Sequence, residues 1–114
     1  MATNDQALRV ERASDTIVLI GEIDAHTAGQ VRDTVLLVPE DADVRLDMSQ
    51  VSFIDSSGLR VILEANQAIE RNGRRLVLIA PSRPVTRVIE VAGLVAHLHI
   101  EAHCRVESSL DPAG

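Results

Sequence analysis

Hydrophobic and polar residues alternate in two stretches near the start of the chain, residues 8–14 (LRVERAS) and 16–23 (TIVLIGEI). Alternation over this length, with several β-branched residues, is typical of strands. Ser14 and Asp15, which separate the two strands, are residue types that favour turns. The pattern therefore predicts that a β-hairpin opens the fold.

Two longer segments follow in which hydrophobic residues recur three and four positions apart, the spacing of helices with one buried face. In the first segment Asp24 is a suitable cap and Pro39 ends the helix. The second covers about residues 57–72, and Gly73 suits the left-handed backbone that follows a helix end. The positions expected to be buried on these two helices are Ala28, Val31, Val35, Val38, Leu59, Ile62, Leu63 and Ile69.

A third helix is expected between Ser82 and Gly93, because serine with a proline two positions later marks a helix start and glycine marks its end. Residues 43–49 and 95–101 alternate as strands do. Residues 75–80 (RLVLIA) are nearly all hydrophobic, the pattern of a strand in the middle of a sheet or covered on both faces. The positions expected to be buried on the third helix are Val85, Val88, Ile89 and Ala92.

The predicted order of elements is β-β-α-β-α-β-α-β, with no internal repeat or linker. Strands that alternate with helices imply crossover connections, so the sheet is expected to be mixed and mostly parallel, with helices packed on it. With 114 residues the chain has the length of a single α/β domain, 1–114, with a core of about residues 8–101. For the polar tail 104–114 the pattern leaves open a short last helix or a frayed end.

Three loops are expected at one edge of this sheet, where the carboxyl ends of the parallel strands meet and where α/β folds usually place their ligands. Their sequences are GEIDAHT, FIDSSG and APSRP. The polar residues that these loops bring to one edge are Asp24, Asp55, Ser56, Ser57, Ser82 and Arg83.

The segment Asp55-Ser56-Ser57-Gly58 carries more polar groups than a helix start requires, because one side-chain oxygen can serve as the cap. One interpretation is structural: Asp55 or one serine caps the helix, and the other polar residue shapes the turn. The other is modification, because free amide groups at a helix start can accommodate a phosphate without disturbing the core. Residue chemistry alone leaves both interpretations open.

The residue pattern does not favour a catalytic or metal site. A serine nucleophile needs a histidine base, but nothing orients His26, and neither G-x-S-x-G nor a phosphate-binding loop occurs. His97 and His99 alternate on a predicted strand, yet no carboxylate or cysteine spacing completes a metal site, so they are expected to be solvated. We therefore expect a protein that is not an enzyme and that holds no metal or cofactor.

Composition favours a protein partner in the cytoplasm. The net charge of −6 argues against nucleic-acid binding, which needs clustered cations, and Phe53 is the one aromatic residue that could stack on bases. No hydrophobic run approaches the roughly 20 residues of a membrane span, and no signal peptide is visible. Cys104 is the single cysteine, so no internal disulfide can form, as is usual in a reducing compartment.

The run LDMSQVSFIDSSGLRVIL, with GEIDAHTA before it and GRRLVLIAPSRPVTRVIEVAGL after it, resembles the STAS domain of bacterial anti-sigma factor antagonists over about residues 8–101. The resemblance implies that the unphosphorylated protein binds an anti-sigma factor, itself a serine kinase, and thereby frees a sigma factor. It also implies that phosphorylation of the first serine of the motif switches this binding off and that a serine phosphatase resets it.

By this resemblance Ser56 is the phosphorylated residue, and Gly58 permits close approach of the backbone. The partner-binding residues that the resemblance implies are Asp24, Asp55, Ser56, Ser57, Gly58, Ser82 and Arg83. Two alternatives remain: an unphosphorylated interaction module of a transporter or a multi-protein sensor, and a nucleotide-binding or hydrolysing enzyme, which the missing phosphate loop disfavours.

Overall fold

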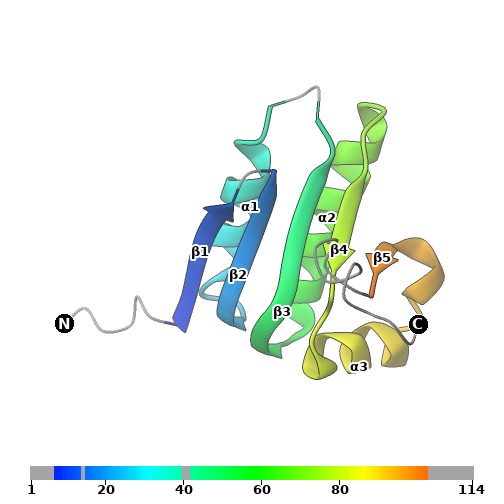
Figure 1. Ribbon diagram of the computed structural model, residues 1–114. Helices are drawn as coiled ribbons and strands as arrows, with labels where there is room; N and C mark the ends of the chain where they lie inside the picture. Colours follow the sequence, from blue (N-terminus) through cyan, green and yellow to red (C-terminus); the bar gives the residue numbers. More distant parts are fainter. Residues whose placement is uncertain (1–6, 14, 40–41, 103–114) are drawn as a thin grey trace, which may run out of the picture.

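The computed structural model describes residues 7–13, 15–39 and 42–102, which form a five-stranded sheet with three helices (Figure 1). Strand order is β1-β2-β3-β4-β5; β1 and β2 are antiparallel, and the other neighbours are parallel. The elements are β1 Leu8–Ala13, β2 Thr16–Ile23, α1 Ala28–Leu36, β3 Val44–Ile54, α2 Ser56–Arg71, β4 Leu76–Ile79, α3 Arg83–Val91, a 3₁₀ turn Val95–His97 and β5 His99–Glu101. The predicted order and fold class are confirmed. Ser14 of the predicted turn and the tail 104–114 lie outside the described residues.

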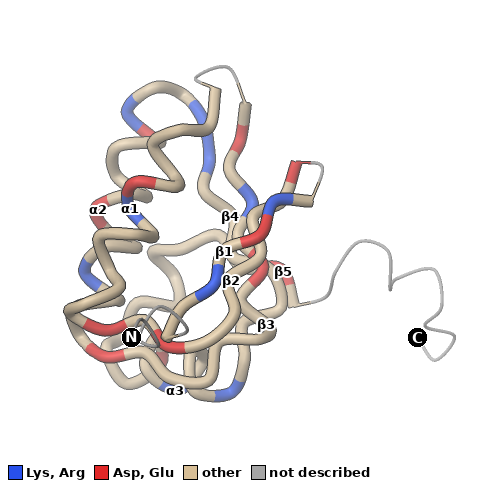
Figure 2. Tube along the Cα trace, turned by 90° about the vertical axis from the view of Figure 1, so that its left-hand side faces the viewer, with Lys and Arg blue, Asp and Glu red and all other residues tan. Residues whose placement is uncertain are grey.

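Two helices, α1 and α2, lie side by side on one face of the sheet, as the view along the sheet in Figure 2 shows. The third helix, α3, contacts β3 near the end of the sheet where that strand runs into α2 (Figure 1). Leu19, Leu46, Leu78 and Ile62 are almost fully buried in the core. Truncating such a residue to alanine typically costs about 2–5 kcal/mol, so this core holds the strand ends in fixed positions.

Most helix positions that the sequence assigns to the core are buried. The buried positions are Ala28, Val31, Val35, Leu59, Ile62, Ile69, Val85 and Ile89. Val38, Leu63 and Val88 are half-buried against the core. The prediction for Ala92 is wrong: the residue is exposed, because α3 ends one residue earlier and Ala92 lies in the turn that closes at Gly93.

Strand β3 is longer than the alternation predicts, Val44–Ile54 instead of residues 43–49. Its pairing with β2 contains register shifts, and beyond Met48 its buried positions are three residues apart, at Val51 and Ile54. Such an irregularity breaks the two-residue period from which a strand is recognised in a sequence. The extra length carries the strand to the start of α2.

The strand predicted over residues 95–101 is shorter in the structure. Val95–His97 form a 3₁₀ turn, closed by a hydrogen bond of 2.9 Å from His97 N–H to the Leu94 carbonyl, and β5 begins at His99. β5 is an edge strand of the sheet, and Ile100 on it is 36% exposed.

The predicted capping role of Asp24 is wrong, because Thr27 occupies the N-cap position of α1. The Asp24 carboxylate instead accepts hydrogen bonds from the backbone N–H groups of His26 (2.9 Å) and Thr27 (3.2 Å), which form a turn ahead of the helix. The buried Thr27 hydroxyl donates to the Glu22 carbonyl (2.8 Å) and accepts from the Asp24 N–H (2.9 Å). These bonds fix the loop between β2 and α1.

Candidate functional site

The junction between β3 and α2 holds the segment Asp55-Ser56-Ser57-Gly58. Asp55 is the N-cap residue of α2, and its carboxylate accepts hydrogen bonds from the N–H groups of Ser57 (2.9 Å) and Gly58 (3.1 Å). One carboxylate therefore caps the helix, and neither serine hydroxyl is needed for that task.

Ser56 is the first residue of α2 and is exposed. Its hydroxyl makes no hydrogen bond to any part of the chain that the structure describes. Ser57, in contrast to the exposed Ser56, is half-buried. An enzyme that binds from solution can therefore reach the Ser56 oxygen while α2 stays folded. The exposure that phosphorylation requires is present, and the modification itself stays a prediction.

Gly58 brings the start of α2 into close contact with the ends of two strands. A Cβ atom at this position would lie 2.7 Å from Cγ2 of Ile23, 2.9 Å from the carbonyl oxygen of Ile23 and 2.9 Å from Cγ1 of Ile54. The backbone N–H of Asp55 also donates to the Ile23 carbonyl at 3.2 Å. Glycine is therefore required here for packing, and this packing sets the position of the exposed Ser56.

The loop before α1 reaches the same junction. A hollow of about 650 Å³ between the amino-terminal parts of α1 and α2 is lined by Ala25, His26, Ala28, Gly29, Arg32, Ser56, Ser57, Arg60, Val61 and Glu64. The loops that the sequence places at one edge of the sheet do meet there, since the segment after Asp24 lies beside Ser56 and Ser57. Arg32 and Arg60 were not predicted as site residues: the four-residue step from Ser56 to Arg60 is visible in the sequence, but Arg32 reaches the site through the packing of α1 on α2.

Ser82 and Arg83 lie at the start of α3, and among the described residues neither lines this hollow. The Ser82 hydroxyl donates to the Val51 carbonyl (2.6 Å), and the Ser82 N–H donates to the Met48 carbonyl (3.1 Å). Ser82 therefore ties α3 to the irregular part of β3. Arg83 is exposed.

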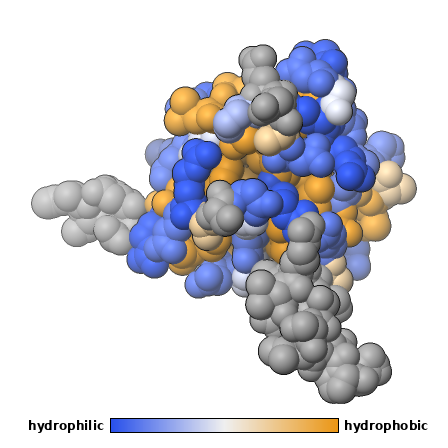
Figure 3. Space-filling model, turned by 45° about the horizontal axis from the view of Figure 1, so that its top comes forward, coloured by the Kyte–Doolittle hydropathy of each residue, from blue (hydrophilic) through white to orange (hydrophobic). Residues whose placement is uncertain are grey.

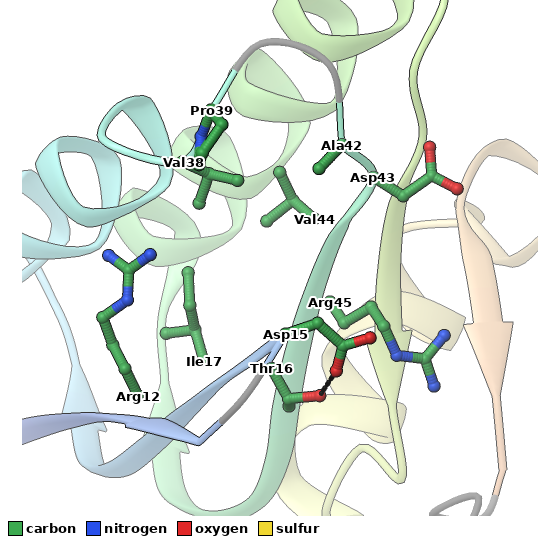
Figure 4. Close-up of a pocket in the computed structure, with 10 residues that line it drawn as sticks. All are labelled: Arg12, Asp15, Thr16, Ile17, Val38, Pro39, Ala42, Asp43, Val44 and Arg45. Carbon is green, nitrogen blue, oxygen red and sulfur yellow. Dashed lines mark hydrogen bonds between the residues drawn. The ribbon is translucent and has the colours of Figure 1, made fainter.

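A second hollow of about 300 Å³ lies at the other end of the sheet, where β2 and β3 begin. Figure 4 shows Ile17, Val38 and Val44 around it, with the longer side chains of Arg12 and Arg45 at its sides. Figure 3, which brings this end forward, shows hydrophobic surface among hydrophilic residues. Because the length of the sheet separates this hollow from Ser56, it is not part of the candidate site.

The three histidines among the described residues have different surroundings. The side chain of His99 is 41% exposed to solvent, and its Nε2 lies 2.9 Å from Oε2 of Glu70. His26 and His97 are exposed. Within the described residues no group of three or more His, Cys, Asp or Glu could hold a metal ion.

No described helix combines the length and hydrophobicity needed to cross a membrane.

Substituting Asp55 with alanine is expected to lower the free energy of unfolding by about 1 kcal/mol, because two amide groups at the start of α2 lose their acceptor. Asp55→Asn keeps a side-chain oxygen at the cap, so its free energy of unfolding is expected to fall by less than that of Asp55→Ala. Urea denaturation followed by circular dichroism measures both changes. Equal stability of Asp55→Ala and the wild type would show that the cap contributes nothing.

Comparison with known proteins identifies the family of this chain. Residues 7–107 match the family model described as the STAS domain. The chain belongs to the STAS domain family. The STAS chain is 38% identical over 88 residues to the anti-sigma-B factor antagonist of Listeria monocytogenes, a match that covers 74% of the chain and 77% of the relative.

Solved structures share the fold of this STAS domain. The anti-sigma factor antagonist SpoIIAA in its unphosphorylated form matches with a TM-score of 0.66 and 25% identity, covering 94% of this chain and 96% of that one. The Bacillus cell fate determinant SpoIIAA in the phosphorylated form matches with a TM-score of 0.61 and 24% identity, covering 95% and 100%. At this level of identity the phosphorylated structure shows the fold alone.

Proposed function

We propose that this STAS domain is an anti-sigma factor antagonist controlled by phosphorylation of Ser56. The unphosphorylated protein binds a cognate anti-sigma factor in the cytoplasm and frees a sigma factor. The anti-sigma factor is also a serine kinase: it transfers the γ-phosphoryl group of ATP to the Ser56 oxygen, the hydroxyl proton leaves, and ADP is released. A serine phosphatase hydrolyses the phosphate and resets the protein, which is a substrate and a ligand and not an enzyme.

The observation that carries the proposal is the free, exposed hydroxyl of Ser56 beside a helix start that Asp55 already caps. A phosphate there adds about 1.5–2 negative charges without removing any contact that holds the fold. The relatives support the antagonist function, since the Listeria protein is named an anti-sigma-B factor antagonist and SpoIIAA an anti-sigma factor antagonist.

The surroundings of Ser56 suit a protein contact that a phosphate can block. Phe53, three residues earlier, is 46% exposed, and exposed aromatic side chains are common anchors in protein interfaces. A phosphate placed in such a contact must lose water and meets any acidic group of the partner, which weakens binding. Within the proposed partner-binding set, Asp55, Ser57 and Gly58 shape the site around Ser56. Asp24 lies in the loop before α1, and Ser82 and Arg83 lie at the start of α3.

The test is a sigma-release assay with the anti-sigma factor and sigma factor of the same organism. Unmodified protein is expected to displace the sigma factor from the complex, measured by size-exclusion chromatography. Protein phosphorylated on Ser56 is expected to bind at least about tenfold more weakly, and Ser56→Asp to bind with intermediate affinity. Equal binding of the two forms would contradict the switch. Failure of the unmodified protein to bind any anti-sigma factor would favour the interaction module of another complex.

A further inference from the structure

The hollow beside Ser56 is lined by an excess of cations, although the protein as a whole is acidic. Its charged lining residues are Arg32, Arg60 and Glu64, which sum to +1 with His26 neutral, whereas the whole chain has a net charge of −6. Arg32 comes from α1, and Arg60 and Glu64 come from α2. The Ser56 hydroxyl therefore lies at the edge of a hollow whose lining side chains carry one net positive charge, with the Asp55 carboxylate at the helix cap beside it.

Both guanidinium groups are available to a new anion. Ser56 and Arg60 are four residues apart on one helix, so their side chains leave the same face one turn apart. Arg60 makes no ion pair with the described residues. Arg32 lies 3.9 Å from Asp33, but both side chains are more than half exposed, and such a pair contributes little.

Three of the four amide groups from Ser56 to Leu59 at the start of α2 are already engaged and not free for a phosphate. The N–H groups of Ser57 and Gly58 already donate to the Asp55 carboxylate, and the N–H of Leu59 donates to the Asp55 carbonyl at 3.0 Å. An anion on the Ser56 oxygen therefore finds its partners in the N–H of Ser56 itself and in nearby side chains, and the guanidinium group has the geometry that binds phosphate through two parallel N–H bonds.

We propose that the hollow is an internal phosphate site in which Arg60 and Arg32 hold the phosphate of phosphorylated Ser56. This rests on the proposed function, because it requires that Ser56 carries a phosphate. The guanidinium of Arg32 lies on the side of α1 that faces the hollow, with Nη2 3.4 Å from the position of a Cβ on Gly29. The phosphate thus lies in the hollow between α1 and α2 and occupies both arginines, so the modified surface loses two free cations as well as gaining an anion.

The test measures the second pKa of the phosphate by phosphorus NMR, on protein made with phosphoserine at position 56 by genetic encoding, so that no kinase is needed. Cations beside a phosphate stabilise the dianion and lower this pKa. We expect the pKa in the wild-type background to lie about half a unit or more below that in the double variant Arg32→Gln/Arg60→Gln.

Arg71→Gln is the matched control, since it removes one cation from α2 about 16 Å along the helix axis from Arg60. It is expected to leave the pKa of the phosphate close to the wild-type value. If the double variant shifts the pKa no more than Arg71→Gln does, the internal phosphate site is wrong. Circular dichroism of the unmodified variants checks their folding, and the exposure of all three arginines favours folded proteins.

The same experiment separates this inference from the proposed function. A lowered pKa of the encoded phosphoserine supports the phosphate site even if no kinase is found to modify Ser56. The lack of such a kinase would overturn the proposed function and leave the phosphate site standing. Conversely, a kinase that modifies Ser56 together with an unshifted pKa would overturn the phosphate site and leave the switch intact.

Discussion

Gly58→Ala is expected to lower the free energy of unfolding by about 2–3 kcal/mol, one of the two largest effects that the structure predicts. The added Cβ would lie within 3 Å of two atoms of Ile23 and one of Ile54, and both isoleucines are buried. One of these atoms is a backbone oxygen, which cannot turn away as a side chain can. Urea denaturation of the variant and the wild type measures the loss.

Gly29→Ala is the matched control for this substitution. Gly29 also lies in a helix, but a Cβ there meets only the end of the Arg32 side chain, at 3.4 Å. Because alanine favours a helix over glycine by about 0.5–1 kcal/mol, this variant is expected to be as stable as the wild type or slightly more stable. A Gly58→Ala protein as stable as Gly29→Ala would show that the start of α2 is not packed as described.

Ser56→Ala is expected to abolish phosphorylation by the cognate kinase, whereas Ser57→Ala is expected to retain it. The two serines differ in their surroundings: Ser56 is exposed with a free hydroxyl, and Ser57 is half-buried. Neither substitution touches the cap, because the Asp55 carboxylate binds backbone amides. Phosphate incorporated per chain, with ATP and purified kinase, measures the difference.

The order of elements could be predicted because hydrophobic spacing decides which face of a helix or strand is buried. Leu46 and Met48 show the two-residue period, and Val31 and Val35 show the four-residue step that α1 requires. The end of β3 could not be predicted, because an irregular register moves its buried positions to Val51 and then three residues further. Local spacing does not reveal such a shift, which depends on pairing with β2.

The candidate site was predicted in part. The sequence identifies Asp55 and Ser56 as neighbours at a helix start, but it cannot decide which residue caps the helix, since either side chain could accept the bonds. The structure assigns the cap to Asp55. The approach of Arg32 to Ser56 depends on how α1 packs on α2, a contact between segments 24 residues apart, and no periodicity within either segment encodes it.

The role of the Asp24 carboxylate is a second feature that the sequence pattern could not decide. An acid ahead of a helical pattern is a reasonable cap, yet its carboxylate serves a turn two and three residues later, and the helix begins after Thr27. A side-chain oxygen can satisfy a turn or a helix start with similar geometry. The buried Thr27 hydroxyl, bonded to Glu22 and Asp24, decides between them in the folded protein.

Phosphate transfer to the Ser56 hydroxyl is the central claim, and intact mass spectrometry of wild type, Ser56→Ala and Ser57→Ala after incubation with the kinase and ATP tests it most directly. One added phosphate is predicted on the wild type and on Ser57→Ala, with none on Ser56→Ala, and the added mass is expected to disappear after phosphatase treatment. A Ser56→Ala protein that takes up phosphate to the same extent as the wild type would contradict the account.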